Sequence, residues 1–173
     1  INESKGILGY SHLLEHIKFH KSKNSKLRLE NSGIVNAYTT KDVTCYYIKC
    51  NRNFMKDAVE QCIDIVFNTS FDDVNLENEK KVVFEEMNLV NSRAEFYNYL
   101  LSTIVDEKNP YHNQTIGSKD DINNATKKTL QQYNDFFYHL SNSKIVCSCS
   151  YSEKPALRRI LKRAFIKHKV PLE

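Results

Sequence analysis

Apolar residues recur along the chain with two spacings, and these predict a mixture of helical and extended segments. Positions three and four residues apart predict helices at 12–20, with a short continuation at 26–31, and at 54–68, 76–105, 126–140 and 154–169. Runs rich in Val, Ile, Thr and Tyr predict strands at 34–38, 43–50 and 144–150. The first two strands are expected to pair around a turn at Lys41 and Asp42.

Helices mixed with strands in this way are typical of the α+β class. We expect helices packed on one face of a mainly antiparallel sheet. The 173 residues can form a substantial core and contain neither an internal repeat nor a flexible linker, so 1–173 is predicted to be a single domain. The chain has no apolar run of membrane-spanning length, so no membrane partner is expected.

Five cysteines bear on the compartment more than on the fold. They form no C-x-x-C pair and their number is odd, so reduced, partly buried thiols are a better interpretation than structural disulfides. Reduced thiols favour a cytoplasmic location. The residues are Cys45, Cys50, Cys62, Cys147 and Cys149.

The positive charge is concentrated near the carboxyl end. The net charge is +4, whereas 154–169 alone holds seven basic residues and no acid, so the rest of the chain is net negative. This segment also has an apolar stripe, which favours a surface helix with a solvated basic face over a nucleic-acid-binding patch. A basic nucleic-acid-binding domain is therefore the less favoured alternative, and it would leave the histidines described next unexplained.

The candidate chemistry begins with the segment His12-Leu13-Leu14-Glu15-His16. Two histidines four apart on a helix are neighbours, so both can reach one metal ion, and Glu15 leans over the same place. This is the minimum needed for a zinc-bound water and its base. The competing interpretation is two surface histidines on a polar helix face, and a third ligand would decide between them because catalytic zinc takes three protein ligands.

The acidic segment 79–87 offers candidates for that third ligand. Glu79 and Glu86 are seven residues apart, or two helical turns, which predicts that both share a stripe with the apolar residues Val82, Val83, Leu89 and Val90. A buried carboxylate without a cation or a metal is costly. A solvated charge run explains Glu86 less well than it explains Glu77, Lys80, Lys81 and Glu85.

His20 is a weaker candidate, although it lies four residues beyond His16. His12 and His20 are eight residues apart, about 12 Å along a helix. Both cannot bind one ion at about 2 Å. We therefore expect His20 at the helix end or exposed.

Several segments occur in the order found in a known family. Residues 9–19 read GYSHLLEHIKF, close to G-x-x-H-F-L-E-H-M-x-F, and 33–39 read GIVNAYT, with an N-A-x-T motif before an aromatic strand. Residues 79–87 match E-x6-E followed by Met, and 109–117 hold NPYH and IG. Together with the helix and strand of 133–146, these segments resemble the pitrilysin or insulinase family of zinc peptidases, which includes insulin-degrading enzyme and mitochondrial processing peptidase.

The resemblance implies a role for each matched residue. His12, His16 and Glu86 would bind Zn²⁺, and Glu15 would be the general base. Glu79 would steady the site from outside the ligand set. Asn36 and Ala37 would lie on an edge strand that binds an extended peptide by strand addition.

The sequence departs from the family pattern in three respects. The 69 residues between His16 and Glu86 are fewer than usual, which shortens a loop after Phe19. The chain begins only eleven residues before His12, so the family's first strands are expected to be missing. The second, similar half that closes over the peptide in family enzymes is absent, which indicates a fragment, or half of a longer or paired enzyme.

The expected function is that of a zinc-dependent endopeptidase domain acting on extended peptides. A second homologous half, in a homodimer or heterodimer or in a longer chain, would complete it. The alternative within the same fold is a half that is non-catalytic, or inactive alone, and serves as the closing partner.

Overall fold

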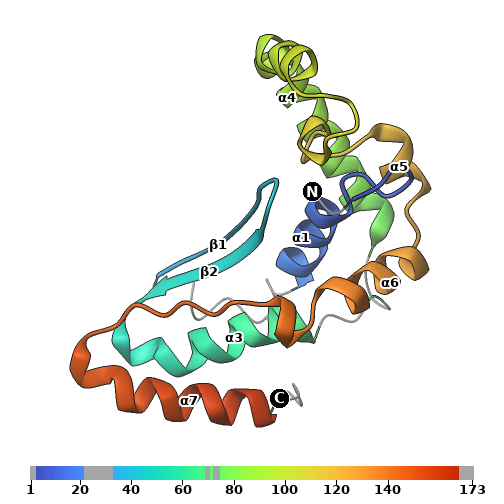
Figure 1. Cartoon of the computed structure of the whole chain (residues 1–173). Coiled ribbons are helices and arrows are strands. Elements are labelled where there is room, and N and C mark those ends of the chain that lie inside the picture. The colour runs from blue at the N-terminus through green and yellow to red at the C-terminus, as the bar shows by residue number, and fades with distance from the viewer. Residues whose placement is uncertain (1–2, 22–32, 69–70, 72–74, 168–173) are drawn as a thin grey trace. The chain divides into compact units, whose positions relative to one another are not determined.

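The computed structural model describes residues 3–21, 33–68, 71 and 75–167, with only the helical backbone described for Lys21 and for 90–102 (Figure 1). Short 3₁₀ turns at Arg52–Phe54, Pro110–His112, Leu140–Asn142 and Tyr151–Glu153 connect the main elements. These elements are α1 (Tyr10–Lys21), β1 (Gly33–Thr39), β2 (Thr44–Cys50), α3 (Met55–Phe67), α4 (Leu76–Ile104), α5 (Lys119–Asn124), α6 (Lys127–Phe137) and α7 (Lys154–Lys167).

The elements confirm the α+β class. Most of them are helices, and β1 and β2 form one two-stranded antiparallel sheet. The chain forms two compact units, each assembled from three separate stretches of sequence. Unit 1 comprises Ile1–Ile17, Tyr38–Cys45 and Phe71–Gln131, and unit 2 comprises Lys18–Ala37, Tyr46–Ser70 and Gln132–Glu173. That 1–173 is a single domain stays a prediction.

Helix α1 places its apolar side chains on one side and its candidate chemistry on the other. Four buried residues follow helical spacing: Tyr10, Leu13, Leu14 and Ile17. At about 100° per residue, His12, Glu15 and His16 fall on the opposite side of the helix. The core of unit 1 therefore fixes the rotation of α1 and leaves these three side chains only partly buried.

The start of α1 is held by two carboxylates. Glu3 accepts hydrogen bonds from the backbone N–H groups of Gly9 (2.7 Å) and Ser11 (2.6 Å), and Asp121 Oδ2 accepts from those of Gly6 and Leu8 (both 3.0 Å). Backbone N–H groups at a helix start have no partner within the helix, and the helix dipole favours an anion there. Glu3 thus caps the first turn of α1, and Asp121 holds the segment that leads into it.

Helix α4 buries a narrower stripe than the sequence predicts. Glu79 (8% exposed) and Val83 are buried, but Val82 (42%) and Leu89 (58%) are exposed, so the predicted placement of the last two is wrong. They lie roughly 100° from Val83 around the helix, at the flank of the buried face. The side chain of Val90 lies outside the described residues.

The predicted exposure of Lys80 on α4 is also wrong. This residue was expected in a solvated charge run but is buried, and its Nζ donates to Asn123 O (2.9 Å) and to Glu77 Oε1 (3.0 Å). The two acceptors satisfy the ammonium group that burial removes from water. Sequence periodicity could not show the carbonyl of Asn123, which comes from the end of α5.

The turn between β1 and β2 is anchored within unit 1. Thr40 N–H donates to Val43 O (2.8 Å), which closes the turn at the predicted place. Lys41 Nζ donates to Asn113 O, and the Tyr111 hydroxyl donates to Asp42. The NPYH loop therefore contacts the tip of the hairpin and restrains it.

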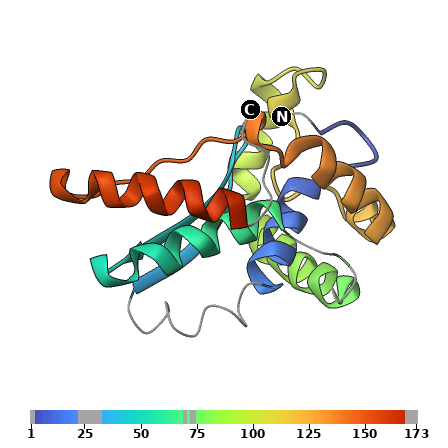
Figure 2. The same cartoon turned by 90° about the horizontal axis from the view of Figure 1, so that it is seen from below.

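In unit 2, α3 and α7 lie side by side in both views (Figures 1 and 2). Ile63, Ala164 and Phe165 form their buried core, while the basic residues 158, 159, 162 and 163 of α7 are exposed, as an amphipathic surface helix predicts. Lys18, at 1% exposed, also belongs to this unit. Its Nζ donates to Val66 O (3.0 Å), and burial lowers its pKa to about 7.

One predicted strand is wrong, and one helix has no counterpart in the prediction. The segment 144–150 is extended but has no ladder partner among the described residues, so it is not a strand. Helix α5 was not predicted, although Ser118 caps it by accepting from Asp121 N–H. The predicted continuation at 26–31 lies outside the described residues.

None of the described helices combines the length and apolarity needed to cross a membrane.

Candidate metal centre

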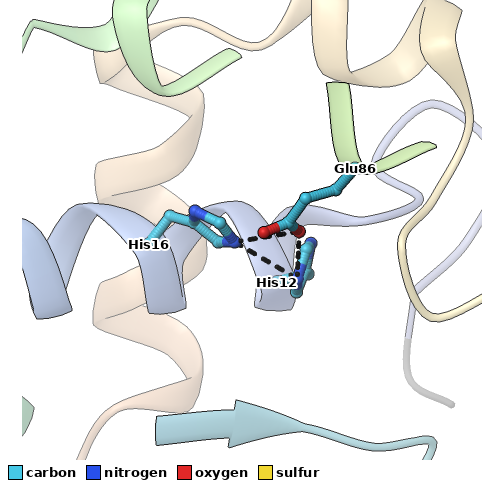
Figure 3. Close-up of side chains that lie close together, drawn as sticks. All are labelled: His12, His16 and Glu86. Carbon is cyan, nitrogen blue, oxygen red and sulfur yellow. Dashed lines mark hydrogen bonds and ion pairs between the residues drawn. The ribbon is translucent and has the colours of Figure 1, made fainter. Parts of the chain in front are cut away.

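Two helices bring three candidate ligands to one point in unit 1. The Nε2 atoms of His12 and His16 lie 3.3 Å apart, and Glu86 Oε2 lies 3.5 Å from the first and 3.4 Å from the second. Figure 3 shows Glu86 reaching from α4 towards the two rings on α1. In the described part of the chain, no other group of His, Cys, Asp or Glu gathers ligand atoms in this way.

The triangle formed by these three residues, here called the trio, has the size that zinc requires. Three ligand atoms about 2.0–2.1 Å from one tetrahedral ion lie roughly 3.3–3.4 Å from each other. The three measured separations, 3.3, 3.4 and 3.5 Å, are close to this value. The trio therefore fits a tetrahedral ion with a fourth position left for another ligand.

The protonation of His12 also suits a ligand role. Burial, followed by the nearby charge of His16, lowers the pKa of His12 to about 4, so its ring is neutral at pH 7. A neutral imidazole is the form that binds a metal. It also follows that the contact between His12 and Glu86 is not an ion pair at neutral pH. His12 Nδ1 is buried and has no hydrogen-bond partner among the described residues.

Glu15 lies beside the trio without joining it. Burial raises the pKa of its carboxyl group, a change that the Thr39 hydrogen bond and His16 oppose and Glu86 adds to. The Thr39 hydroxyl donates to Glu15 Oε2 at 2.7 Å. Thr39 was not among the predicted site residues, although it is the Thr of the N-A-x-T motif.

The remaining predicted site residues do not belong to the trio. Glu79 is buried on α4, two turns before Glu86, and its steadying role stays a prediction. Asn36 and Ala37 lie in β1 and belong to unit 2, where Asn36 Oδ1 accepts from Ala37 N–H (2.9 Å). Their contact with a peptide also stays a prediction. His20 is exposed and lies outside the trio, as expected.

Residues 1–119 match the model of the protein family described as "Insulinase (Peptidase family M16)". The probable mitochondrial-processing peptidase subunit beta of Schizosaccharomyces pombe is 32% identical over 133 residues, covering 72% of this chain and 29% of that protein. The zinc protease PqqE of Helicobacter pylori is 28% identical over 155 residues, covering 84% of this chain and 34% of that protein.

Solved structures share the fold over most of the chain. A protease from Helicobacter pylori has a TM-score of 0.75 at 24% identity, covering 95% of this chain and 41% of that one. A putative M16-like peptidase from Alicyclobacillus acidocaldarius has a TM-score of 0.75 at 25% identity, covering 92% and 38%. The chain thus spans well under half the length of these relatives. From the family match over residues 1–119, the chain belongs to the insulinase family of peptidases, M16.

Proposed function

We propose that this chain is the metal-binding half of a zinc endopeptidase, with His12, His16 and Glu86 as the zinc ligands. The observation that carries the proposal is the triangle of Nε2, Nε2 and Oε2 atoms, whose sides are those of a tetrahedral zinc site. Relatives named as zinc proteases support the choice of metal.

Glu15 is the general base in this proposal. Zinc, when bound, supplies a Lewis acid that makes a water molecule nucleophilic near neutral pH. Glu15 accepts a proton from the attacking water and returns one to the departing amine. The burial that raises its pKa makes it a better proton acceptor than an ordinary surface carboxylate.

The proposed substrate is an extended peptide. The backbone of β1 at Asn36 and Ala37 would hydrogen-bond to it as an added strand, an arrangement that reads peptide shape more than sequence. A second homologous half would complete the enzyme. Relatives named as subunits of the mitochondrial-processing peptidase support a paired arrangement, and the chain covers only 27% of the human one.

A second candidate function is that of a non-catalytic partner half. It is favoured by one observation: a human relative that is 32% identical over 133 residues is named as subunit 1 of the cytochrome b-c1 complex and not as a peptidase. Against it stands the trio, because a half that only closes over its partner has no need of three convergent ligands.

The test compares the parent chain with Glu15→Gln, each combined with a second homologous half. Zinc content is measured by mass spectrometry and cleavage with a fluorogenic unfolded peptide. We expect one zinc per chain in both proteins and a cleavage rate at least about 100-fold lower in the variant, the usual contribution of a general base. Glu85→Gln, at an exposed position one residue before Glu86, is the matched control and should behave as the parent.

Two results would contradict the proposal. A parent chain that holds no zinc at neutral pH would remove its basis. A parent chain that holds zinc but does not cleave the peptide, in the presence of the second half, would favour the partner function.

A further inference from the structure

Thr39, the last residue of β1, makes a direct contact with the proposed base. Its Oγ1 donates to Glu15 Oε2 at 2.7 Å, a short hydrogen bond of the kind that a hydroxyl makes to a carboxylate. Both residues belong to unit 1 and both are partly buried. Strand β1 therefore restrains the Glu15 side chain, which projects from helix α1.

The hydrogen bond is part of a directed chain of hydroxyl groups. Thr44 Oγ1, on β2, lies 3.2 Å from Thr39 Oγ1. A hydroxyl has one proton, and Thr39 gives its proton to a carboxylate, which only accepts. Thr44 must therefore donate to Thr39, and hydrogen bonds in such a series strengthen one another.

The hairpin that carries both threonines is fixed at its tip. The contacts of Lys41 with Asn113 and of Tyr111 with Asp42 hold the turn between the two strands. Because the tip is restrained, the position of the Thr39 hydroxyl is set by the fold of unit 1 and does not depend on the rotamer of a long side chain.

The contact also distinguishes the two oxygen atoms of Glu15. Oε2 accepts from Thr39, and among the described residues Glu15 has no second hydrogen-bond donor. Oε1 is therefore the oxygen left to accept a proton from water. Without Thr39, rotation about the last side-chain bond would exchange the two oxygens and let the carboxylate move.

We propose that Thr39 is a positioning residue for Glu15, which holds the carboxylate by Oε2 and leaves Oε1 for proton transfer. The inference rests on the proposed function, because it takes Glu15 as the base. The consequence is a rate effect: a base displaced by about 1 Å can cost 100-fold in rate without any loss of substrate binding.

The first test measures peptide cleavage by the chain combined with its second half. Thr39→Val keeps the shape of the side chain and removes the hydroxyl, and we expect kcat to fall roughly 10- to 100-fold while KM and zinc content stay near the parent values. Thr39→Ser restores the hydroxyl and should recover most of kcat.

Thr40→Val is the matched control for damage to the hairpin. Thr40 Oγ1 bonds within the turn, to Val43 O at 3.2 Å, and does not contact Glu15. We expect this variant to keep the parent kcat. The proposal is overturned if Thr39→Val keeps the parent kcat, or if Thr39→Ser loses as much as Thr39→Val.

A second test uses the metal-free chain and needs no activity. The urea midpoint of unfolding is measured for Thr39→Val, Glu15→Ala and the double variant. If the hydrogen bond exists in solution, the shift caused by Thr39→Val is smaller when residue 15 is already Ala. Thr40→Val should give the same shift in both backgrounds.

The two tests separate this inference from the proposed function. If Glu15→Gln abolishes cleavage but the Thr39 and Glu15 shifts are simply additive, the positioning role fails and the peptidase stands. If the parent neither holds zinc nor cleaves, the proposed function fails and the positioning role falls with it, whatever the coupling.

Discussion

His12 presents its two ring nitrogens to very different surroundings. Its Nε2 lies among the trio, whereas its Nδ1 is buried, and the ring is neutral at pH 7 because its pKa is lowered to about 4. With Nε2 as the ligand atom, the ring proton would lie on Nδ1, so the tautomer would be fixed. Burial on α1 therefore keeps this histidine in the neutral form that can bind a metal.

Replacing a trio residue should weaken zinc binding strongly, whereas replacing a nearby histidine should not. For His12→Ala we expect zinc affinity to fall by more than the roughly 10- to 100-fold typical of losing an outer-shell partner. The matched control is His20→Ala, on the same helix but exposed and outside the trio. Zinc titration with a competing chelator measures both, and equal affinities for the two variants would remove His12 from the site.

The position of helix α1 depends on a close approach of two glycines. Gly9 has φ +90° and Gly117 has φ +87°. A Cβ on Gly9 would lie 2.6 Å from Ile116 O and 2.8 Å from Gly117 Cα. Both are backbone atoms that cannot rotate away, so the segment before α1 meets the segment before α5 only because neither residue has a side chain.

Gly9→Ala should accordingly destabilise unit 1 more than Gly6→Ala does. Gly6 has φ +99°, but a Cβ at this position would meet no atom within 4 Å, so its substitution causes backbone strain alone, about 1–3 kcal/mol. Gly9→Ala adds the backbone clash, and we expect its free energy of unfolding to be lower than that of Gly6→Ala by at least about 1 kcal/mol. Urea unfolding measures the difference, and equal losses would show that the close approach is relaxed in solution.

The spacing of residues along the chain was enough to predict which face of a helix carries which side chains. It was not enough to predict burial or contacts that depend on a group far away in the sequence. The stripe of α1 and the spacing of Glu79 and Glu86 follow from helical geometry alone. Lys80, by contrast, is buried because of a carbonyl at Asn123, and the hydroxyl of Thr39 matters because Glu15 lies 24 residues before it.

The extended segment 144–150 shows the same limit for strands. Its composition favours a strand, but a strand requires a neighbour with which to exchange backbone hydrogen bonds. No such neighbour is present among the described residues. Sequence could identify His12, His16 and Glu86 as candidates through helix geometry and motif, whereas their 3.3–3.5 Å separations required the fold.

All three candidate ligands belong to unit 1, although the chain forms two units. They come from two of its three stretches, Ile1–Ile17 and Phe71–Gln131. An ion that binds all three therefore links segments about seventy residues apart, and its binding free energy adds to the stability of the folded state.

Zinc should raise the thermal stability of the chain through the trio. At a free zinc concentration 100 times Kd, we expect the free energy of unfolding to rise by about 2.7 kcal/mol. For a chain of this size the rise corresponds to roughly 5–10 °C in Tm. Excess EDTA should reverse the change, as followed by circular dichroism. The same rise in His12→Ala would instead indicate binding elsewhere, for which the thiols of the five cysteines, none of them in a disulfide, are candidates.

Chemical labelling of the Lys18 amine can report local unfolding of unit 2. The residue is 1% exposed and its amine is bonded to Val66 O, so an acylating reagent in solution cannot reach it while the unit is closed. Exposed amines such as that of Lys154 carry no such protection. Because lysine acylation is irreversible and changes mass, the rate at which Lys18 is labelled measures how often this part of the chain opens.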